Sequence, residues 1–453
     1  FGSEKNGRML WGFRRSHSFD NYQELHRAFQ AKHISMKYFF SLALVAITLG
    51  VFAQDTTKNA LNEKLLERKA LRKTKAEQRI ANTKKVPQII LGAYADTYYS
   101  YYLNGEANKQ QVHNCIGAYN QTFGLNVAQV SAEFEGVHFR GKVTLQFGDI
   151  PNIAWTGISA AQEAYAGVKL GERTWLDIGY FKTHIGAESF LPKDNLMSQI
   201  ALATFYGPFY QSGARLMHET KGGWNLQAHL ISGYNRQIDN NKKPSIGLLV
   251  SKEFSDHVTV SYSNLFGEEE VSVNNADFLF YNNIYTNLTF GKWKAQISAD
   301  VATQMGKFEF GRPSENNLLF ASFATVKRSI KGPHSISLKG EWFYDPSSIN
   351  SRNFTPEAQN ISASNVPVYQ SELVANFTEG LNIFGATIGY EYAKPAGYLR
   401  IESRFLNNQN AALSSYPTNY DRETVDLDGI IANRLGAMVT LGIYFDKKLN
   451  FNK

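Results

Sequence analysis

Hydrophobic and polar residues alternate along most of the chain beyond residue 86, in runs of about ten residues. In 292–301 the apolar positions are Trp293, Ala295, Ile297, Ala299 and Val301, and the polar positions between them are Lys294, Gln296, Ser298 and Asp300. The run 434–445 shows the same alternation. Successive side chains of a β-strand point to opposite faces, so each run predicts a strand with one apolar and one polar face.

The length of these runs favours strands that cross a lipid bilayer. About 9–11 tilted residues span a membrane, whereas strands of soluble proteins average about 5–6 residues. Beyond Val86 no apolar run reaches the roughly 20 residues of a membrane-spanning helix. Lipid offers no hydrogen-bond partners, so strands in a bilayer must form a closed sheet. The pattern predicts an all-β transmembrane antiparallel barrel, and a soluble secreted β-protein is the alternative.

The connections between the predicted strands alternate between long and short, as expected when tight turns lie at one end of a barrel and longer loops at the other. Thirteen strands are predicted before residue 345, at 88–102, 121–134, 138–148, 161–169, 174–184, 206–218, 223–234, 245–253, 257–266, 276–289, 292–304, 316–328 and 334–344. Three more follow, at 381–392, 398–406 and 434–445. Residues 366–377 also look extended, but counting them gives an odd number. Bacterial single-chain barrels have even strand numbers, so we expect 16 strands, with 18 as the alternative.

The segments before the predicted barrel have a different character. From Met36 the chain reads MKYFFSLALVAITLGVFAQ, a basic residue followed by an apolar run and then small residues. This is the pattern of a secretory signal peptide, which we assign to 36–53 with cleavage after Ala53. A short membrane anchor is the alternative. We expect residues 1–35 to be upstream sequence outside the natural protein, which would then start at Met36.

Net charge separates these segments from the predicted barrel at 87–453. The total of +7 divides into +4 for residues 1–53 (7 Lys+Arg, 3 Asp+Glu), +6 for 54–85 (10 and 4) and −3 for 86–453 (30 and 33). Leucines recur at roughly helical spacing in the basic segment, so 54–86 is predicted to be a charged periplasmic helix or a flexible tether. The barrel region has no basic stripe, which argues against a nucleic-acid partner.

The polar faces of the predicted strands supply candidate pore-lining residues. A barrel of 16 to 18 strands encloses an aqueous channel, and a Lys or Arg on the lipid face would cost roughly 2–4 kcal/mol at the bilayer midplane. We therefore expect these residues to face the channel: Lys142, Gln146, Lys294, Asp300, Lys339, Glu341, Glu391, Arg400, Glu402 and Arg404. Their mixed signs argue against strong ion selectivity.

One predicted loop, 185–205, is long and fairly apolar. We expect part of it to fold into the channel and narrow it, with Glu188, Lys193, Asp194 and Asn195 as constriction residues. An external loop packed on its neighbours is the alternative. The chain has no HExxH, GxSxG, P-loop or CxxC motif, and Cys115 is its only cysteine. We therefore assign no catalytic residue, metal site or cofactor.

Several stretches resemble the OmpL-like β-barrel porins, a family of Gram-negative outer-membrane proteins. They are GAYADTYYSYY (92–102), NQTFGLNVAQVSAEF (120–134) with GKVTLQFGD (141–149), AQEAYAGVKLG (161–171), GYFKTHIGAES (179–189) with YGPFYQSGARL (206–216), and GYEYAKPAGYLRIESRF (389–405). The resemblance extends over about 88–445. It implies a porin-like outer-membrane fold and brings no catalytic residues.

These observations together predict a porin in the outer membrane of a Gram-negative cell, through which small hydrophilic solutes diffuse passively. The expected partners are outer-membrane lipid, the solutes and, by analogy of fold, further copies of the chain in a homotrimer. The alternative is a barrel that acts as an adhesin, a receptor or an envelope-anchoring structural protein. In that case the loops 345–380 and 407–433 would carry the function.

Overall fold

The computed structural model describes residues 87–450, except 104, 106, 112, 156–158, 236, 240–242, 270–277, 306–317, 347–348, 351–380 and 410–432. The chain divides into two units, Phe1–Thr83 and Lys84–Lys453. The predicted upstream segment, signal peptide and charged helix or tether all lie outside the described residues, as does 366–377. The expectations for these segments therefore remain predictions.

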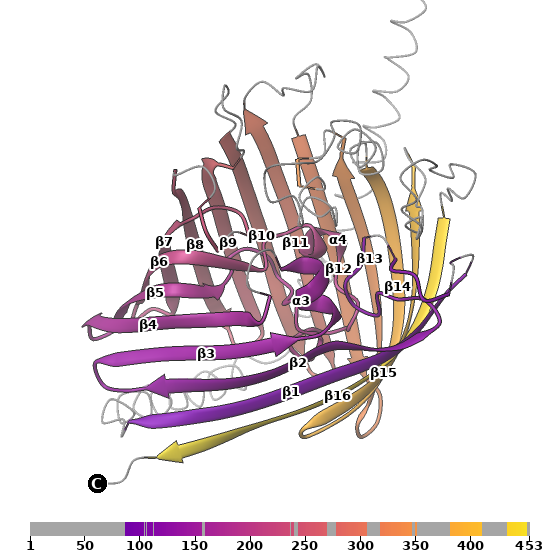
Figure 1. The fold of residues 1–453 in the computed structure, drawn as a ribbon, viewed down its shortest axis with the longest axis horizontal. Coiled ribbons are helices and arrows are strands. Elements are labelled where there is room, and N and C mark those ends of the chain that lie inside the picture. The colour runs from indigo at the N-terminus through magenta and orange to yellow at the C-terminus, as the bar shows by residue number, and fades with distance from the viewer. Residues whose placement is uncertain are drawn as a thin grey trace, which may run out of the picture. The chain divides into compact units, whose positions relative to one another are not determined.

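Sixteen antiparallel strands form a closed barrel in which each strand pairs with its neighbours in sequence and β16 pairs with β1 (Figure 1). The strands are β1 (Gln88–Tyr102), β2 (Thr122–Glu135), β3 (Phe139–Phe147), β4 (Ala161–Gly171), β5 (Thr174–Lys182), β6 (Tyr210–Glu219), β7 (Trp224–Ile231), β8 (Ser245–Ser255), β9 (Val258–Glu268), β10 (Phe278–Phe290), β11 (Trp293–Met305), β12 (Leu318–Ser329), β13 (His334–Asp345), β14 (Leu381–Lys394), β15 (Gly397–Asn408) and β16 (Asn433–Asn450). At the closing seam the pairing is continuous from Gln88 opposite Asn450 to Tyr102 opposite Gly436. The predicted 16-stranded barrel is confirmed, and closure leaves no sheet edge unpaired.

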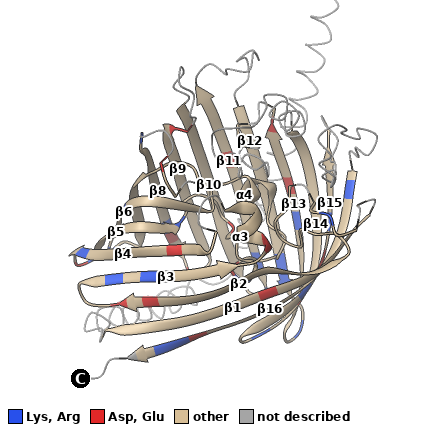
Figure 2. Ribbon diagram, in the orientation of Figure 1, with Lys and Arg blue, Asp and Glu red and all other residues tan. Residues whose placement is uncertain are grey.

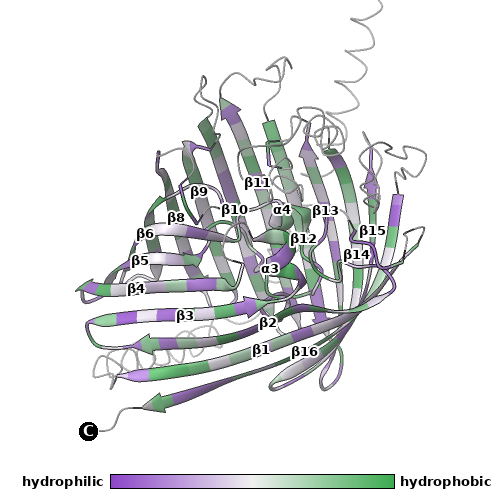
Figure 3. Cartoon of the chain, in the orientation of Figure 1, coloured by the Kyte–Doolittle hydropathy of each residue, from purple (hydrophilic) through white to green (hydrophobic). Residues whose placement is uncertain are grey.

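The two faces of the barrel wall follow the alternation of the sequence. On β13 the side chains of Ile336 and Leu338 are 47% and 62% exposed, whereas those of Ser337 and Lys339 are 4% and 3% exposed. Hydrophobic and hydrophilic bands alternate along the strands in the same way (Figure 3). The apolar set therefore forms the outer surface that a bilayer would cover, and the polar set points inward.

In the part of the chain that the structure describes, long connections between early strands fold into the barrel. Loop 103–121 joins β1 to β2, loop 148–160 joins β3 to β4 and contains α3 (Asp149–Ala154), and loop 183–209 joins β5 to β6 and contains η2 (Pro192–Asp194) and α4 (Leu202–Phe205). Figure 1 shows α3 and α4 within the ring of strands, where α3 contacts β2 and β3 and α4 contacts β12 and β13. None of the helices in the described part of the chain has the length and apolar character of a membrane span.

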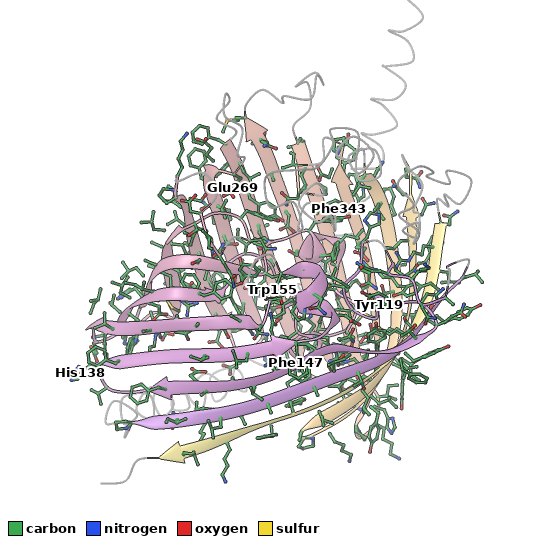
Figure 4. All side chains as sticks on the ribbon, in the orientation of Figure 1. Tyr119, His138, Phe147, Trp155, Glu269 and Phe343 are labelled. Atoms are coloured by element: carbon green, nitrogen blue, oxygen red, sulfur yellow. The ribbon has the colours of Figure 1, made fainter. Side chains whose placement is uncertain are left out.

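The inward course of the first two loops differs from the external course that the alternation of loop lengths predicted. The reason is their apolar content, because Cys115, Ile116 and Ile150 are fully buried against the inward-facing side chains of the barrel. In loop 148–160 the indole of Trp155 stacks on the ring of Phe209, with centroids 5.6 Å apart. Figure 4 shows Trp155 beside α3. The interior therefore contains a hydrophobic core as well as polar residues.

The predicted start of β6 at residue 206 is also wrong, because the strand begins at Tyr210. Residues 206–209 instead form the end of the inward connection after α4, and the amide of Tyr206 donates to the carbonyl of Leu202 (2.9 Å). The apolar run that suggested a longer strand is instead packed inside the barrel, where Phe205 and Phe209 are 4% and 2% exposed.

Candidate functional site

The central feature of the barrel interior is loop 183–209, called here the inner loop. It leaves β5 at His184, whose Nδ1 lies 2.8 Å from Oε1 of Gln211 and whose Nε2 lies 2.8 Å from the carbonyl oxygen of Asn264 on β9. Gly247 on β8 makes this close approach possible, since a Cβ there would lie 2.4 Å from the imidazole. Burial lowers the pKa of His184. The start of the inner loop is thus fixed against β8 and β9.

Further along, the inner loop lies against a set of charged residues on β12 to β15, called here the charged wall. The charged wall consists of Lys327, Lys339, Glu341, Glu391, Arg400, Glu402 and Arg404. Arg400 donates to the carbonyl oxygens of Pro192 (2.7 Å) and Asn195 (3.0 Å). Its neighbour Glu402 accepts the backbone N–H groups of Ser198 (2.6 Å) and Gln199 (2.8 Å). Two charged side chains on one strand therefore hold the backbone of the inner loop directly.

Two carboxylates hold the part of the inner loop around α4. Glu341 accepts the backbone N–H of Leu202 (2.7 Å), at the first turn of α4, together with the guanidinium of Arg404 (2.7 Å). Within the loop, Glu188 accepts the N–H of Ala201 (2.7 Å) and also receives the ammonium group of Lys339. Charge-assisted hydrogen bonds of this kind are shorter and stronger than neutral ones.

Positive and negative side chains are equal in number where the inner loop meets the charged wall. The charged wall has four cations and three carboxylates, and Glu188 of the inner loop supplies the fourth carboxylate. Glu391 pairs with both Lys327 (2.5 Å) and Arg400 (2.7 Å), and Arg404 pairs with Glu341. The paired side chains are between 1% and 13% exposed. They face inward as the alternation predicts, and the inner loop covers them.

Apart from Asn195, the other predicted residues lie outside this contact. On β3, Lys142 pairs with Glu163 (2.8 Å), and Gln146 accepts from Gln162 (2.9 Å). On β11, Lys294 is exposed and Asp300 is buried. Of the proposed constriction residues, Asn195 contacts the charged wall, Asp194 pairs with Lys182 (3.5 Å), and Lys193 lies over the ring of Tyr94, its Nζ 5.0 Å from the centroid. Burial lowers the pKa of Lys193.

Sequence reasoning missed several members of the site. Lys327 lies on the inward face of β12, and the alternation along that strand would have placed it there. The backbone amides of Ser198, Gln199 and Leu202 left no signal in the residue pattern, because any residue except proline carries such a donor.

A buried cluster on β3, β5 and β6 was also missed. Asp177 is 0% exposed and accepts a two-pronged contact from Arg140 (2.8 and 2.7 Å) and a further bond from Arg215 (2.9 Å). The guanidinium of Arg215 also lies 4.5 Å from the ring centroid of Phe181. One carboxylate thus neutralises two arginines drawn from different strands, and the three side chains tie β3, β5 and β6 together.

The inward faces of β9 and β10 form a second, uncharged surface, called here the neutral wall. It consists of Thr259, Ser261, Ser263, Leu265, Gly267, Leu279, Tyr281, Asn283, Tyr285, Asn287 and Thr289. Figure 2 shows the difference between the two walls, since charged residues mark β13 to β15 while β9 and β10 are almost free of them. Hydroxyl and amide groups dominate the neutral wall, and both can donate and accept hydrogen bonds.

A cavity of about 240 Å³ lies between the inner loop and β10 to β12. Its barrel side is formed by Tyr281, Ser298, Asp300 and Phe323, and its other side by inner-loop residues that include Glu188 and Thr204. The inner loop therefore closes against the charged wall and leaves open space next to Tyr281, Asp300 and Phe323.

Loop 103–121 supports the inner loop from another side. The imidazole of His113 shares a hydrogen bond with the hydroxyl of Tyr206, and Gln199 Nε2 donates to the carbonyl of Ile116 (3.3 Å). Burial lowers the pKa of His113 to about 3 and raises the pKa of the Cys115 thiol to about 12. Both side chains are therefore neutral at physiological pH, which suits a packed interface.

Comparison with solved structures shows that this barrel is similar in fold to outer-membrane channels. The anion-selective porin from Comamonas acidovorans matches with 11% identity and a TM-score of 0.50, over 79% of this chain and 100% of that chain. The outer membrane channel DcaP of Acinetobacter baumannii matches with 11% identity and a TM-score of 0.50, over 80% and 98% of the two chains. At such identities the likeness shows a shared fold. No curated protein matches the sequence significantly.

A match to a protein-family model identifies the family of the chain, whereas the structural likeness shows only its fold. The model of the family described as "Putative beta-barrel porin-2, OmpL-like" matches residues 88–435, which is more than half of the chain and nearly the whole barrel. The match covers the strands that form the charged wall, the neutral wall and the inner loop between β5 and β6. The chain therefore belongs to the OmpL-like family of β-barrel porins.

Proposed function

We propose that this protein is a passive diffusion pore for small hydrophilic solutes, narrowed by its inner loop. The family and the 16-stranded barrel support a channel rather than an enzyme. The proposal depends mainly on one observation: the inner loop is bound to one side of the barrel interior and leaves space on another side. Glu188 and the backbone around Ser198 are bound to the charged wall, whereas a cavity remains on the side of Asp300.

The charged residues act in this proposal mainly as anchors of the constriction. Lys339, Arg400 and Glu402 hold the inner loop across the channel, and their mutual neutralisation leaves little net field in the narrow zone. The route for solutes follows the neutral wall, past Asn287 and Tyr285. We therefore expect weak ion selectivity. Lys193 and Asp194 border the constriction from the inner loop, and Lys294 lines the channel as an exposed cation on β11.

The proposal includes the position of the protein in the cell and its partners. We propose that the chain is exported by the signal at 36–53, is cleaved after Ala53, and inserts its apolar outer face into outer-membrane lipid. N-terminal sequencing of the mature protein should then begin at Gln54. We further propose a homotrimer, which chemical cross-linking in native membranes tests by a product of three chains. The adhesin, receptor or anchoring alternative rests mostly on loop residues outside the described ranges.

The experiment that tests the pore is current recording across a planar lipid bilayer. The purified full chain should produce stepwise, ohmic increases in conductance, and a heat-unfolded sample at the same concentration should produce none. Swelling of liposomes that contain the protein should also be faster in small sugars than in large ones. Barrels that insert, as judged by heat-dependent mobility on a gel, but pass no current would overturn the proposed function.

A further inference from the structure

The cavity beside the inner loop contains a carboxylate whose hydrogen bonding is incomplete. Asp300 on β11 is 3% exposed, and its Oδ1 accepts from the hydroxyl of Tyr281 (2.8 Å) and from Nδ2 of Asn283 (2.8 Å). Among the described residues, Oδ2 of Asp300 and Oδ1 of Asn283 have no hydrogen-bond partner. Buried acceptors are rarely left without a donor in native proteins. Beside its neighbours Tyr281, Asn283 and Ser298, Asp300 therefore retains the capacity to accept a further hydrogen bond.

The other charges that line the cavity already have partners. On its inner-loop side, Lys182 pairs with Asp194 and Glu188 pairs with Lys339. No lysine or arginine in the described part of the chain forms an ion pair with Asp300. At about 240 Å³ the cavity has many times the space that one water molecule needs. It is large enough for a small solute that donates hydrogen bonds.

We propose that this cavity is a binding subsite for a neutral, hydroxyl-rich solute such as a sugar or polyol, an inference that rests on the proposed pore function. Hydroxyl groups of the solute donate to the carboxylate of Asp300 and exchange hydrogen bonds with the hydroxyls of Ser298 and Thr204, which also line the cavity. The cavity also offers the ring of Phe323 as an apolar surface. Apolar walls with a few fixed polar groups are typical of small-molecule sites.

The aromatic rings favour a neutral solute over an organic cation. The ammonium group of Lys339 lies 5.6 Å from the ring centroid of Phe323, and that of Lys182 lies 5.5 Å from that of Phe190. Both rings line the cavity and already face a cation. A second cation in the cavity would lie near rings that these lysines already face, and like charges repel in a site of low dielectric.

The neutral wall extends the subsite along the channel. Asn283 lies opposite Ser263 on β9, and Tyr285 and Asn287 follow it on the inward face of β10. These hydroxyl and amide groups give a sugar successive hydrogen-bond partners, so that it can leave the subsite without losing all its contacts at once. Efficient conduction requires binding that is weak and distributed over several positions. The arrangement therefore favours passage of sugars rather than their retention.

The test is the block of single-channel potassium current by glucose, maltose and sorbitol, added to the wild-type protein and to Asp300→Asn. The wild type should show concentration-dependent block, and Asp300→Asn should weaken the apparent affinity by about tenfold, the effect of one lost hydrogen bond to a charged group. Ser298→Ala, at the cavity wall, should weaken it less. Glu253→Gln on β8 is the matched control, because this inward position lies outside the cavity, and should leave the affinity unchanged.

The outcomes separate the subsite from the pore. A folded protein without any conductance overturns the proposed function itself. Conductance that none of the three solutes reduces overturns the subsite and leaves the pore standing. If Asp300→Asn changes the ratio of cation to anion permeability but not the block by sugars, Asp300 is a cation site and the inference is wrong. Heat-dependent gel mobility confirms for each variant that the barrel is closed, and Ser298→Ala provides the comparison if Asp300→Asn fails to fold.

Discussion

Lys339 of β13 donates its ammonium group to the carboxylate of Glu188, 151 residues earlier in the chain, and each side chain is only 1% exposed. The same ammonium group donates to the carbonyl of Gln199 (2.6 Å). One side chain of the barrel thus binds both arms of the inner loop. Such a buried pair contributes little net stability compared with apolar residues, but it defines one arrangement and is costly to break on one side only.

Removal of the cation alone should therefore destabilise the protein strongly. We expect Lys339→Met to lower the free energy of unfolding by about 3–5 kcal/mol, because it leaves the Glu188 carboxylate buried without its partner. Urea-induced unfolding in detergent or lipid measures this value. The double variant Lys339→Met with Glu188→Gln removes both charges and should recover most of the loss. A single variant that loses less than about 1 kcal/mol, as an exposed pair would, contradicts the anchoring role.

The Asp177 cluster provides an independent stability prediction. Asp177→Asn leaves Arg140 and Arg215 without a counter-charge, and we expect a loss of about 3–5 kcal/mol in the free energy of unfolding. Asp194→Asn is the matched control, because its pair with Lys182 is 41% and 34% exposed and should cost about 0–1 kcal/mol. Equal effects of the two substitutions in urea unfolding would show that burial does not decide the strength of these contacts.

Acid should loosen the packing of loop 103–121 on the inner loop. Burial lowers the pKa of His113 from 6.5 to about 3, so the opened loop binds more protons than the packed loop between these two values. The contribution of neutral His113 to the stability of the packed state is fully present above pH 6.5. It falls by up to about 1.4 kcal/mol for each pH unit below that value. The single thiol, Cys115, is 0% exposed and reports opening.

The measurement is the reaction of Cys115 with a pyridyl disulfide that works in acid, expressed relative to the unfolded chain at the same pH. The relative rate should rise as the pH falls from 6.5 to 4. His113→Gln removes the titrating group and should flatten this dependence. A rate that stays constant in the wild type, or that rises equally in His113→Gln, contradicts the assignment. The raised pKa of Cys115, about 12, has no influence in this pH range.

The two faces of the wall can be distinguished with single spin labels. In a Cys115→Ser background, a label at Leu338, which is 62% exposed on the outer face, should be accessible to oxygen dissolved in lipid. A label at Gln227, on the inward face of β7, should be accessible to a water-soluble nickel reagent. Reversed accessibilities in reconstituted vesicles would contradict the membrane orientation of the barrel wall.

The strands were predictable because a barrel wall constrains every second residue. β1 spans Gln88–Tyr102, the range that the alternation predicted, and the inward direction of Lys339 and Arg400 followed from the same pattern. The alternation does not show which residue an inward side chain will contact. Glu188 meets Lys339 only because the inner loop crosses the lumen, and no local residue preference encodes that path.

The inward loops were harder to predict because their position also depends on contacts with residues far away in the sequence. Residues such as Ile116 and Ile150 are apolar, but short apolar stretches also occur in external loops. α3 has six residues, less than two full turns, and its sequence carries no helical periodicity. These segments are fixed by contacts with inward aromatic residues of distant strands, so their burial becomes evident only when the barrel is closed.

The central claim is that the inner loop narrows an aqueous channel. Its most direct test is the single-channel conductance of a variant that lacks residues 190–200, compared with the wild type in the same salt and with the closed barrel verified by heat-dependent gel mobility. The account predicts a higher conductance and weaker discrimination by solute size, since the segment bound by Arg400 and Glu402 is gone. An unchanged or lower conductance in a folded variant would contradict it.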